Sequence, residues 1–182
     1  MDKKFISEVL KSGGTIGALS PSSSFLAKKM LRPIRFKTAR CIVEYGPGTG
    51  IFTLKLLERL HPEGKLLAFE VNREFYEALK QINDPRLVVI NDSAEKIESY
   101  LRKYHCSHAD FIVSSLPLTV LPENMVHNIL INSRYCLSES GAFIQFQYSL
   151  KLRSKLKSVF SKVKIRFTFF NIPPAFVFIC RK

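Results

Sequence analysis

The pattern of apolar and polar residues changes repeatedly along this chain between short apolar runs and a helical spacing of apolar residues. Short, nearly continuous apolar runs predict buried strands at residues 41–43, 65–70, 86–90, 109–113 and 141–148. Between them, apolar residues spaced three and four positions apart predict helices at 51–57, 73–81, 94–104 and 123–137. A basic amphipathic segment follows at 150–160, and two final strands are expected at 163–170 and 175–180.

Strands that alternate with helices build a parallel sheet, because each helix returns the chain to the edge at which the previous strand began. Two strands joined by a short connection then add an antiparallel finish. The chain is therefore predicted to have an α/β fold with a mostly parallel sheet, an antiparallel last strand and helices on both faces. Since the sequence holds no internal repeat and no linker, one compact domain is expected.

The first 36 residues carry two helical patterns ahead of the first strand. Residues 3–11 place four apolar side chains on one face, with three lysines and a glutamate around the other. Residues 22–31 follow a run of serines that can cap a helix. The first of these helices suits a membrane surface and the protein's own core equally well. We therefore expect N-terminal helices at 1–36, facing a membrane or substrate, and a ligand-binding domain at 37–182.

The length and net charge of the chain limit the classes of partner that it is expected to bind. The chain has 182 residues, enough for one domain with a full core, and 28 basic residues against 15 acidic ones give a net charge of +13. This charge favours nucleic acid or an anionic membrane surface, although a solvated basic face would look the same. No apolar run approaches the ~20 residues of a membrane span, and the first residues lack the apolar core of a signal peptide. We therefore expect a cytoplasmic protein.

Cysteine usage indicates reduced thiols. The four cysteines lie far apart in the sequence, and three of them fall in apolar runs. Cys106 stands between His105 and His108, but no second pair of ligands accompanies it. We expect no metal, and nothing in the sequence indicates an obligate protein partner.

The stretch after the first strand carries the strongest chemical signal. Glu44 ends the strand, and Gly46, Gly48 and Gly50 follow directly before the next helix. Glycines let the backbone turn tightly and let a ligand approach it, and the first helical N–H groups are free donors. The G-x-G-x-G spacing differs from the G-x-G-x-x-G of dinucleotide folds. The sequence therefore predicts a nucleotide-binding loop, and the carboxylate of Glu44 suits a cationic ligand rather than a phosphate.

Two further acids stand at the ends of the next two predicted strands. Glu70, followed by Val71, comes about twenty residues after the glycines, a spacing at which a carboxylate binds the two ribose hydroxyls of a nucleotide. Asp92 follows the third strand and precedes Ser93 and Ala94. Taken alone, Asp92 is equally suited to cap the next helix.

The acid two positions before the glycine triplet resembles the first motif of the class I S-adenosylmethionine (SAM) methyltransferases. The resemblance covers nearly the whole chain and implies a Rossmann-like, seven-stranded sheet with SAM as the cofactor. It also implies that Glu44 interacts, directly or through water, with the charged amino-acid end of SAM. Asp92 then accepts a hydrogen bond from the adenine amino group, with the backbone of Ser93 and Ala94 beside the ring.

The loop after the fourth strand is the expected catalytic edge, because ligands in open α/β sheets bind beyond the carboxyl ends of the strands. Its residues would orient the attacking nitrogen and accept its proton. The candidates are the carbonyls and hydroxyls of Ser114 and Ser115, together with Leu116, Pro117 and, nearby in the sequence, Tyr45. No histidine follows a predicted catalytic strand, so no catalytic base is assigned.

Two methyltransferase groups resemble this chain. The rRNA adenine dimethyltransferases resemble it in the glycine loop, but their Asn-Leu-Pro-Tyr/Phe loop reads Ser115-Leu116-Pro117-Leu118 here. The asparagine that would hold the adenine amino group is missing, as is the stacking ring, which is worth on the order of 1–3 kcal/mol. The bacterial phospholipid N-methyltransferases resemble the chain at residues 17–23, 44–50, 115–118 and 171–177.

The second resemblance implies a SAM-dependent N-methyltransferase that acts on the amino headgroup of a phospholipid similar to phosphatidylethanolamine. Such a protein would be associated peripherally with an anionic membrane surface. The alternative is an rRNA adenine N6-methyltransferase, which the positive net charge would also serve. A SAM-binding protein without catalysis, and a small soluble amine as substrate, both remain open.

Overall fold

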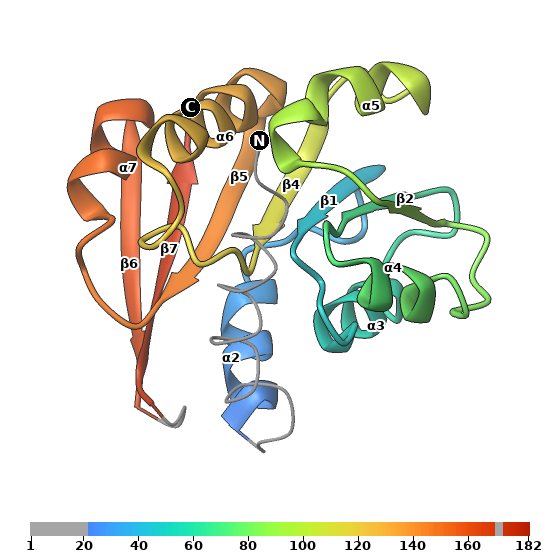
Figure 1. Cartoon of the computed structure of the whole chain (residues 1–182), viewed down its shortest axis with the longest axis horizontal. Helices are drawn as coiled ribbons and strands as arrows, with labels where there is room; N and C mark the ends of the chain where they lie inside the picture. Colours follow the sequence, from blue (N-terminus) through green and yellow to red (C-terminus); the bar gives the residue numbers. More distant parts are fainter. Residues whose placement is uncertain (1–21, 170–172) are drawn as a thin grey trace.

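The computed structural model describes residues 22–169 and 173–182, so the helix expected at 3–11 and part of the tail at 171–177 lie outside the described residues. One seven-stranded sheet contains β1 Cys41–Tyr45, β2 Lys65–Phe69, β3 Leu87–Ile90, β4 Ala109–Ser114, β5 Leu137–Gln147, β6 Lys162–Thr168 and β7 Ala175–Arg181. The strand order is β3-β2-β1-β4-β5-β7-β6 (Figure 1). Strands β1 to β5 run parallel and β7 is antiparallel to both of its neighbours, which confirms the predicted sheet.

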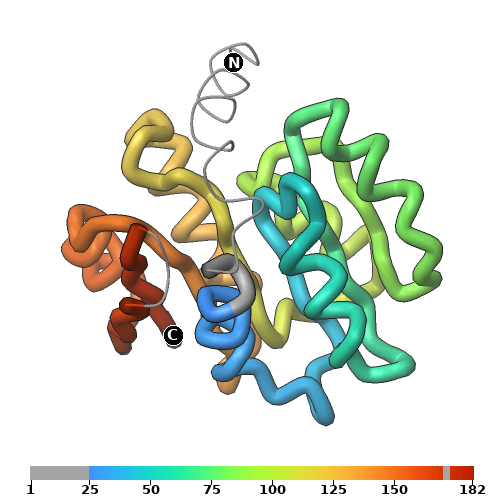
Figure 2. The backbone as a smooth tube through the Cα atoms, turned by 90° about the horizontal axis from the view of Figure 1, so that it is seen from below, coloured from blue at the N-terminus to red at the C-terminus, as the bar shows by residue number. Residues whose placement is uncertain are grey.

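Helices cover both faces of the sheet, as predicted. α2 (Ser22–Leu31) and α3 (Ile51–Leu57) pack on one face, and α5 (Ile97–Lys103), α6 (Glu123–Cys136) and α7 (Arg153–Val159) pack on the other. α4 (Arg73–Leu79) contacts β3, and a 3-10 turn, η1 (Ala94–Lys96), leads into α5. Figure 2 shows α2 between α3 and the β6–β7 pair.

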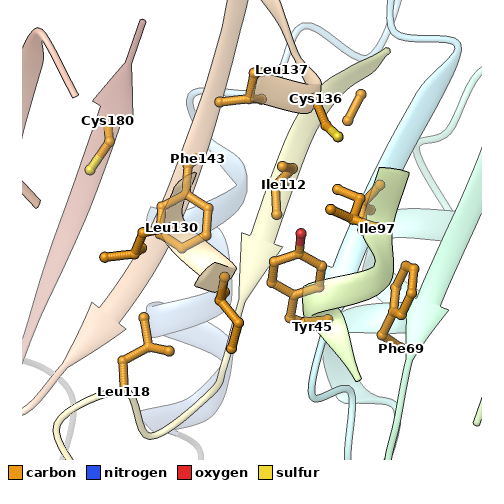
Figure 3. Packing of buried hydrophobic residues seen from close by; sticks show 14 of the residues in the cluster. Tyr45, Phe69, Ile97, Ile112, Leu118, Leu130, Cys136, Leu137, Phe143 and Cys180 are labelled. Carbon is orange, nitrogen blue, oxygen red and sulfur yellow. The ribbon is translucent and has the colours of Figure 1, made fainter. Parts of the chain in front are cut away.

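The strand residues point alternately into two apolar cores. In β1, Val43 and Tyr45 lie in the core with α5 and α6, which we call the first core, while Ile42 lies in the second core with α2 and α3. Every residue of β1 is buried, because helices cover both faces of the sheet there. Figure 3 shows Tyr45, Ile112 and Phe143 of three neighbouring strands in the first core. These central strands give a rigid support to the loops at their carboxyl ends.

α2 is part of the second core. Its residues Leu26, Met30 and Leu31 are buried there, and the helix contacts α3, β5, β6 and β7. Phe36 follows α2 in the sequence, and the centre of its ring lies 4.2 Å from the guanidinium of Arg59. The division of the chain at residue 36 stays a prediction.

The structure corrects several element boundaries. β5 starts at Leu137, directly after α6, whereas the sequence pattern predicts a helix to residue 137 and a strand from 141. The polar residues 138–140 interrupt the apolar pattern, but the strand continues through them because a register shift opposite Ala109 and Phe111 absorbs the extra residues. The helix expected at 94–104 begins as the 3-10 turn, and the segment at 150–160 is an α-helix only over Arg153–Val159.

Candidate active site

The candidate site lies at the carboxyl ends of β1, β2 and β4, where the strand order reverses. The chain leaves β1 toward β2 and later returns to its other side as β4, which leaves a crevice between the loops. The pocket there is lined by Gly46, Phe69, Glu70, Val71, Asp92, Ser93, Ala94, Leu116, Pro117, Leu121, Met125 and Ile129. Six residues predicted to bind the cofactor and two predicted for catalysis are among them. Glu44, Tyr45, Gly48, Gly50, Ser114 and Ser115 do not line it.

The glycine loop fits closely against its surroundings. Gly46 has a φ of 65° and Gly50 a φ of 83°, in the left-handed region that favours glycine. A Cβ at Gly46 would lie 3.0 Å from the Leu116 side chain, and one at Gly50 would lie 3.0 Å from that of Leu79. The Gly46 N–H donates to the Phe69 carbonyl at 2.9 Å. Any side chain at these two positions would strain the backbone and crowd the side chains of Leu116 and Leu79.

Glu44, on β1, is fully buried. Its Oε2 accepts a hydrogen bond from the Thr53 hydroxyl of α3 at 2.7 Å, while its Oε1 has no partner among the described residues. Burial raises the pKa of Glu44 to about 8, although the Thr53 hydrogen bond lowers it, and the charge of Glu70 raises it further. A buried carboxyl with an unpaired oxygen suits a positively charged ligand, because a cation favours its ionised form.

Glu70 ties the glycine loop to the second strand. Its Oε2 accepts a hydrogen bond from the Gly48 N–H at 3.0 Å, and its Oε1 accepts one from the Asn72 N–H at 2.8 Å. Burial raises the pKa of Glu70, and the backbone hydrogen bonds oppose that shift. Because a carboxylate oxygen has two lone pairs, each oxygen still has room to accept one further hydrogen bond. The role of Glu70 at the ribose stays a prediction.

Asp92 is held rigidly at the pocket wall. Its Oδ1 accepts a hydrogen bond from the Ser93 N–H at 2.8 Å, and its Oδ2 accepts from the Lys96 ammonium at 2.9 Å and the Tyr100 hydroxyl at 3.0 Å. Burial acts to raise the pKa of Asp92, but these hydrogen bonds outweigh it and leave the pKa below its usual value. Ser93, not Asp92, caps the following turn by accepting from the Glu95 N–H at 3.3 Å. The helix-capping alternative for Asp92 is therefore wrong.

The loop after β4 is fixed through its backbone. The Ser115 N–H donates to the Tyr45 carbonyl at 2.9 Å, and the hydroxyl of the fully buried Ser114 accepts from the Leu116 N–H at 3.4 Å. The Ser115 hydroxyl is buried and has no partner among the described residues. Leu116 and Pro117 line the pocket, so the loop gives it aliphatic walls.

Two glutamines on β5 fix this loop, and they are absent from the sequence-based candidates. Gln145 Nε2 and Gln147 Nε2 donate to the Leu116 carbonyl at 3.0 and 3.1 Å, and the Leu118 N–H donates to the same oxygen at 2.9 Å. This carbonyl is thereby saturated and is not available to a substrate. The sequence does contain a signal, because two amides at alternate positions of an apolar strand point to the same face and need partners there.

Tyr45 is the candidate that the structure corrects. Its side chain is fully buried in the first core (Figure 3), and its hydroxyl lies 3.1 Å from the Ser133 hydroxyl of α6. Alternation along β1 sends residue 45 to the face opposite Glu44, away from the glycine loop's contacts with α3. A phenol enclosed in this way does not touch a substrate, so its contribution is structural.

The residues of the site fit a nucleoside that carries positive charge. Carboxylates stand at or beside the ends of β1, β2 and β3, and no lysine or arginine is among the residues that line the pocket. Phe69, Met125 and Ile129 form an apolar wall that suits a flat ring. A pyrophosphate would find no cation in this pocket, whereas the ammonium and sulfonium of SAM meet opposite charge. No group of side chains in the described part of the chain could hold a metal ion.

This sheet and this pocket define a class I methyltransferase fold, and solved structures agree. A 1,6-didemethyltoxoflavin-N1-methyltransferase of Burkholderia thailandensis, with S-adenosylhomocysteine bound, superposes with a TM-score of 0.76 at 12% identity over 99% of this chain and 86% of that one. The N-methyltransferase NodS of Bradyrhizobium japonicum, also with S-adenosylhomocysteine, gives 0.72 at 13% identity over 90% and 88% of the two chains. At such identities these likenesses show the fold.

The chain belongs to the ribosomal RNA adenine dimethylase family, which it matches over residues 22–161. An ornithine lipid N-methyltransferase of Singulisphaera acidiphila is 28% identical over 180 residues, which cover 97% of this chain and 94% of the relative. A ribosomal RNA small subunit methyltransferase A of Dehalococcoides mccartyi is 27% identical over 148 residues, 81% of this chain but 42% of that relative. The protein is a SAM-dependent N-methyltransferase, and SAM is its cofactor, as predicted.

Within residues 22–169 and 173–182, none of the helices is both long enough and apolar enough to cross a membrane.

Proposed function

We propose that this enzyme methylates the amino nitrogen in the headgroup of a phospholipid similar to phosphatidylethanolamine, at an anionic membrane surface. The observation that carries the proposal is the loop after β4, which offers no ring to a base. Leu118 occupies the position of the aromatic residue in the loop pattern of the rRNA enzymes. It is only 2% exposed and packs in the first core (Figure 3). The pocket walls from this loop, Leu116 and Pro117, are aliphatic and suit an alkylamine.

The two relatives differ in a way that supports the same proposal. The match to the ornithine lipid enzyme extends over almost the whole length of both chains, whereas the match to the rRNA enzyme covers 42% of that protein. A lipid headgroup is therefore the substrate class that agrees with the longer match and with the aliphatic loop.

The three strand-end acids have complementary roles in the proposed complex. Glu44 would favour the charged amino-acid end of SAM, Glu70 would accept from the ribose hydroxyls beside Val71, and Asp92 would accept from the adenine amino group. The backbone of Ser93 and Ala94 would lie beside the ring. The glycine loop at Gly46, Gly48 and Gly50 lets this ligand approach the backbone.

SAM, when bound, supplies an electrophilic methyl group and its own leaving group. The chain must place a neutral amine in line with that methyl, so that the C–N bond forms while the electrons of the C–S bond leave with sulfur. The nitrogen then releases one proton. The Leu116 carbonyl is saturated and does not accept a hydrogen bond from the amine. Ser115 stays the predicted acceptor of this loop, and its hydroxyl is buried, without a partner among the described residues, and outside the pocket lining. Positioning supplies most of the rate in such a reaction.

The experiment that tests this proposal measures methyl transfer from labelled SAM to two substrates in parallel. One sample holds anionic vesicles with an aminolipid, and the other holds total rRNA. Label in the lipid phase is the expected result. Label in RNA alone would overturn the proposal and would mean that the loop at residues 115–118 holds a base without its usual ring.

Adenine in rRNA is the second candidate substrate, and the family match over residues 22–161 favours it. The positive net charge of +13 would serve RNA as well as lipid. The same experiment separates the two, because each substrate is present in a sample of its own.

A further inference from the structure

We propose that the protein docks on an anionic bilayer through three exposed apolar side chains at the carboxyl ends of the strands, Val120, Leu150 and Phe169. We call these three residues the apolar rim. This inference rests on the proposed function, because an enzyme that methylates a lipid headgroup must bring its pocket to the lipid surface. It adds which surface of the protein makes the contact.

The apolar rim extends over the carboxyl ends of three strands. Val120 lies in the loop after β4, Leu150 lies in the loop after β5, and Phe169 follows β6 directly. The carboxyl ends of β4, β5 and β6 share one edge of the sheet, because β7 is antiparallel to both β5 and β6. Figure 1 shows the two loops and the end of the β6–β7 pair on that same side of the molecule.

Contacts link these segments to one another. The Thr119 hydroxyl lies 3.5 Å from Gln147 Oε1, which joins the loop of Val120 to the end of β5. Gln147 pairs with Phe176 of β7 in the sheet register. The Phe176 ring lies 4.8 Å from that of Phe167, whose ring lies 4.4 Å from that of Phe169. A row of neighbours therefore runs from the loop of Val120 through the end of β5 to Phe169, and Leu150 follows Gln147 by three residues in the sequence.

The rim side chains are unusually exposed for their chemistry, and one of them, Val120, lies in a loop that lines the pocket. Val120 is 53% exposed, Leu150 43% and Phe169 75%. In the sequence, Val120 lies between Pro117 and Leu121, both of which line the pocket. Exposed apolar side chains along one edge of a sheet, next to a loop that lines a pocket, mark a candidate interaction surface.

Charge decides what kind of partner the rim meets. The sequence has no aspartate or glutamate from residue 140 to residue 182, and none from residue 9 to residue 43. The charged side chains on α2, α7, β6 and β7 are therefore all basic. Lys151 is exposed directly beside Leu150, and Lys28 is exposed on α2. Glu123, the acid closest to Val120 in the sequence, is paired with the Lys155 ammonium at 2.8 Å.

Apolar side chains set in basic surroundings fit an anionic bilayer, because basic residues are attracted to acidic headgroups while the apolar groups enter the acyl boundary. RNA would be attracted by the same lysines and arginines. It would gain nothing from aliphatic groups such as Val120 and Leu150, since these offer no flat ring for stacking. The two aliphatic residues of the rim, Val120 and Leu150, are thus the part of the surface that distinguishes the two partners, because the Phe169 ring could also stack on a base.

The test uses the full chain and vesicles of phosphatidylglycerol with a fraction of phosphatidylethanolamine, followed by sedimentation. The variant Leu150→Ser with Phe169→Ser is compared with a control, Ile131→Ser with Tyr135→Ser, which removes two exposed apolar residues from the later part of α6. We expect the rim variant to lose about tenfold or more in vesicle partitioning, since each side chain forfeits burial in the bilayer. The control should stay within about twofold of the unaltered protein.

Two further measurements make each outcome decisive. SAM affinity by calorimetry reports whether a variant is folded, and Phe169→Ser alone replaces the double variant if that one fails to fold. Vesicle partitioning of the rim variant within about twofold of the unaltered protein would overturn the docking surface. Binding to rRNA but not to vesicles by the unaltered protein would overturn it in favour of the nucleic acid.

Methyl transfer to the aminolipid in neutral detergent micelles separates this inference from the proposed function. If the micellar lipid is methylated but vesicle binding is the same in the rim variant and the unaltered protein, the proposed function stands and the docking surface is wrong. Vesicle binding that depends on the rim, without any methylation of micellar lipid, would do the reverse.

Discussion

The two halves of the sheet differ in the charge of the polar side chains at their strand ends. In the half formed by β1, β2 and β3, buried or half-buried carboxylates stand at the strand ends, namely Glu44, Glu70 and Asp92. In the other half, the polar side chains at the ends of β4 and β5 are neutral, namely Ser114, Gln145 and Gln147. We call these the acidic half and the neutral half. The first suits a cationic cofactor.

The neutral half has a chemical reason of its own in the proposed reaction. An amine attacks only through its free lone pair, and a carboxylate close by would favour the protonated ammonium. Confining the acids to one half of the sheet therefore keeps negative charge near the cofactor and away from the nucleophile. The following changes test whether the two halves are separable in this way.

The largest effect is expected in the acidic half, at Glu70. Replacing it by alanine removes a carboxylate that accepts from the Gly48 and Asn72 N–H groups and is proposed to bind the ribose. Two charge-assisted hydrogen bonds at about 1.5–3 kcal/mol each predict a loss of at least about 100-fold in SAM affinity, measured by calorimetry. Glu74→Ala, an exposed acid on α4, is the matched control. Unchanged affinity in a folded Glu70→Ala protein would remove Glu70 from the cofactor site.

A smaller but pH-dependent effect is expected at Glu44. Burial raises its pKa from 4.5 to about 8, so the folded protein without SAM favours the neutral carboxyl. The stability that this neutral form contributes is present below pH 4.5 and is lost as the pH rises through about 8. Glu44→Gln, which stays neutral, should therefore be more stable than the unaltered protein at pH 9, by about 1 kcal/mol or more. Thermal unfolding at pH 6 and pH 9 measures this.

The same substitution should weaken SAM binding by about tenfold, because the amide offers a cation no negative charge. Binding of SAM to the unaltered protein near pH 7 should release protons as Glu44 ionises. Calorimetry in two buffers of different ionisation enthalpy detects that release. Equal heats in both buffers would mean that Glu44 does not sense the charge of the cofactor.

The two halves also differ in how far the sequence predicts them. In the acidic half each predicted ligand residue lies at or just after the end of its own strand, so the local pattern of an apolar run followed by an acid locates Glu44, Glu70 and Asp92 in the sequence. In the neutral half the loop after β4 is fixed by Gln145, which lies 29 residues away from Leu116 in sequence. Single-sequence patterns carry no information about such a contact.

The direction in which each side chain points is a second feature that the sequence pattern did not predict. Tyr45 is adjacent to the glycine loop in the sequence, but strand alternation sends its ring into the first core. Ser93 rather than Asp92 caps the next turn, although both residue types are good caps. Proximity in sequence therefore predicted a set of candidate residues but not the direction or the role of each side chain. The succession of strands and helices along the chain was predictable because the periodicity of each extends over a whole element.

A moderate effect is expected in the neutral half, at Gln147. Gln147→Leu removes one donor from the Leu116 carbonyl and leaves the loop less firmly held. Loss of a hydrogen bond of about 1 kcal/mol predicts a fall of about fivefold in kcat for methyl transfer. SAM affinity should be unchanged, since Gln147 belongs to the other half. Gln81→Leu, at an exposed position after α4, is the control. An equal loss of SAM affinity in Gln147→Leu would show that the halves are not separable.

The smallest effect, and the sharpest in specificity, is expected at Asp92. Its carboxylate is already bound by Lys96, Tyr100 and Ser93, so Asp92→Asn should reduce the affinity for S-adenosylhomocysteine by only about threefold. The inosine analogue, S-inosylhomocysteine, presents a carbonyl oxygen where adenine presents its amino group. An asparagine amide can donate to that oxygen, whereas a carboxylate repels it. The ratio of the two affinities, measured by calorimetry, should therefore move toward the inosine analogue in the variant. A ratio that does not change would place the adenine amino group away from Asp92, and the acidic half would then recognise charge without recognising the base.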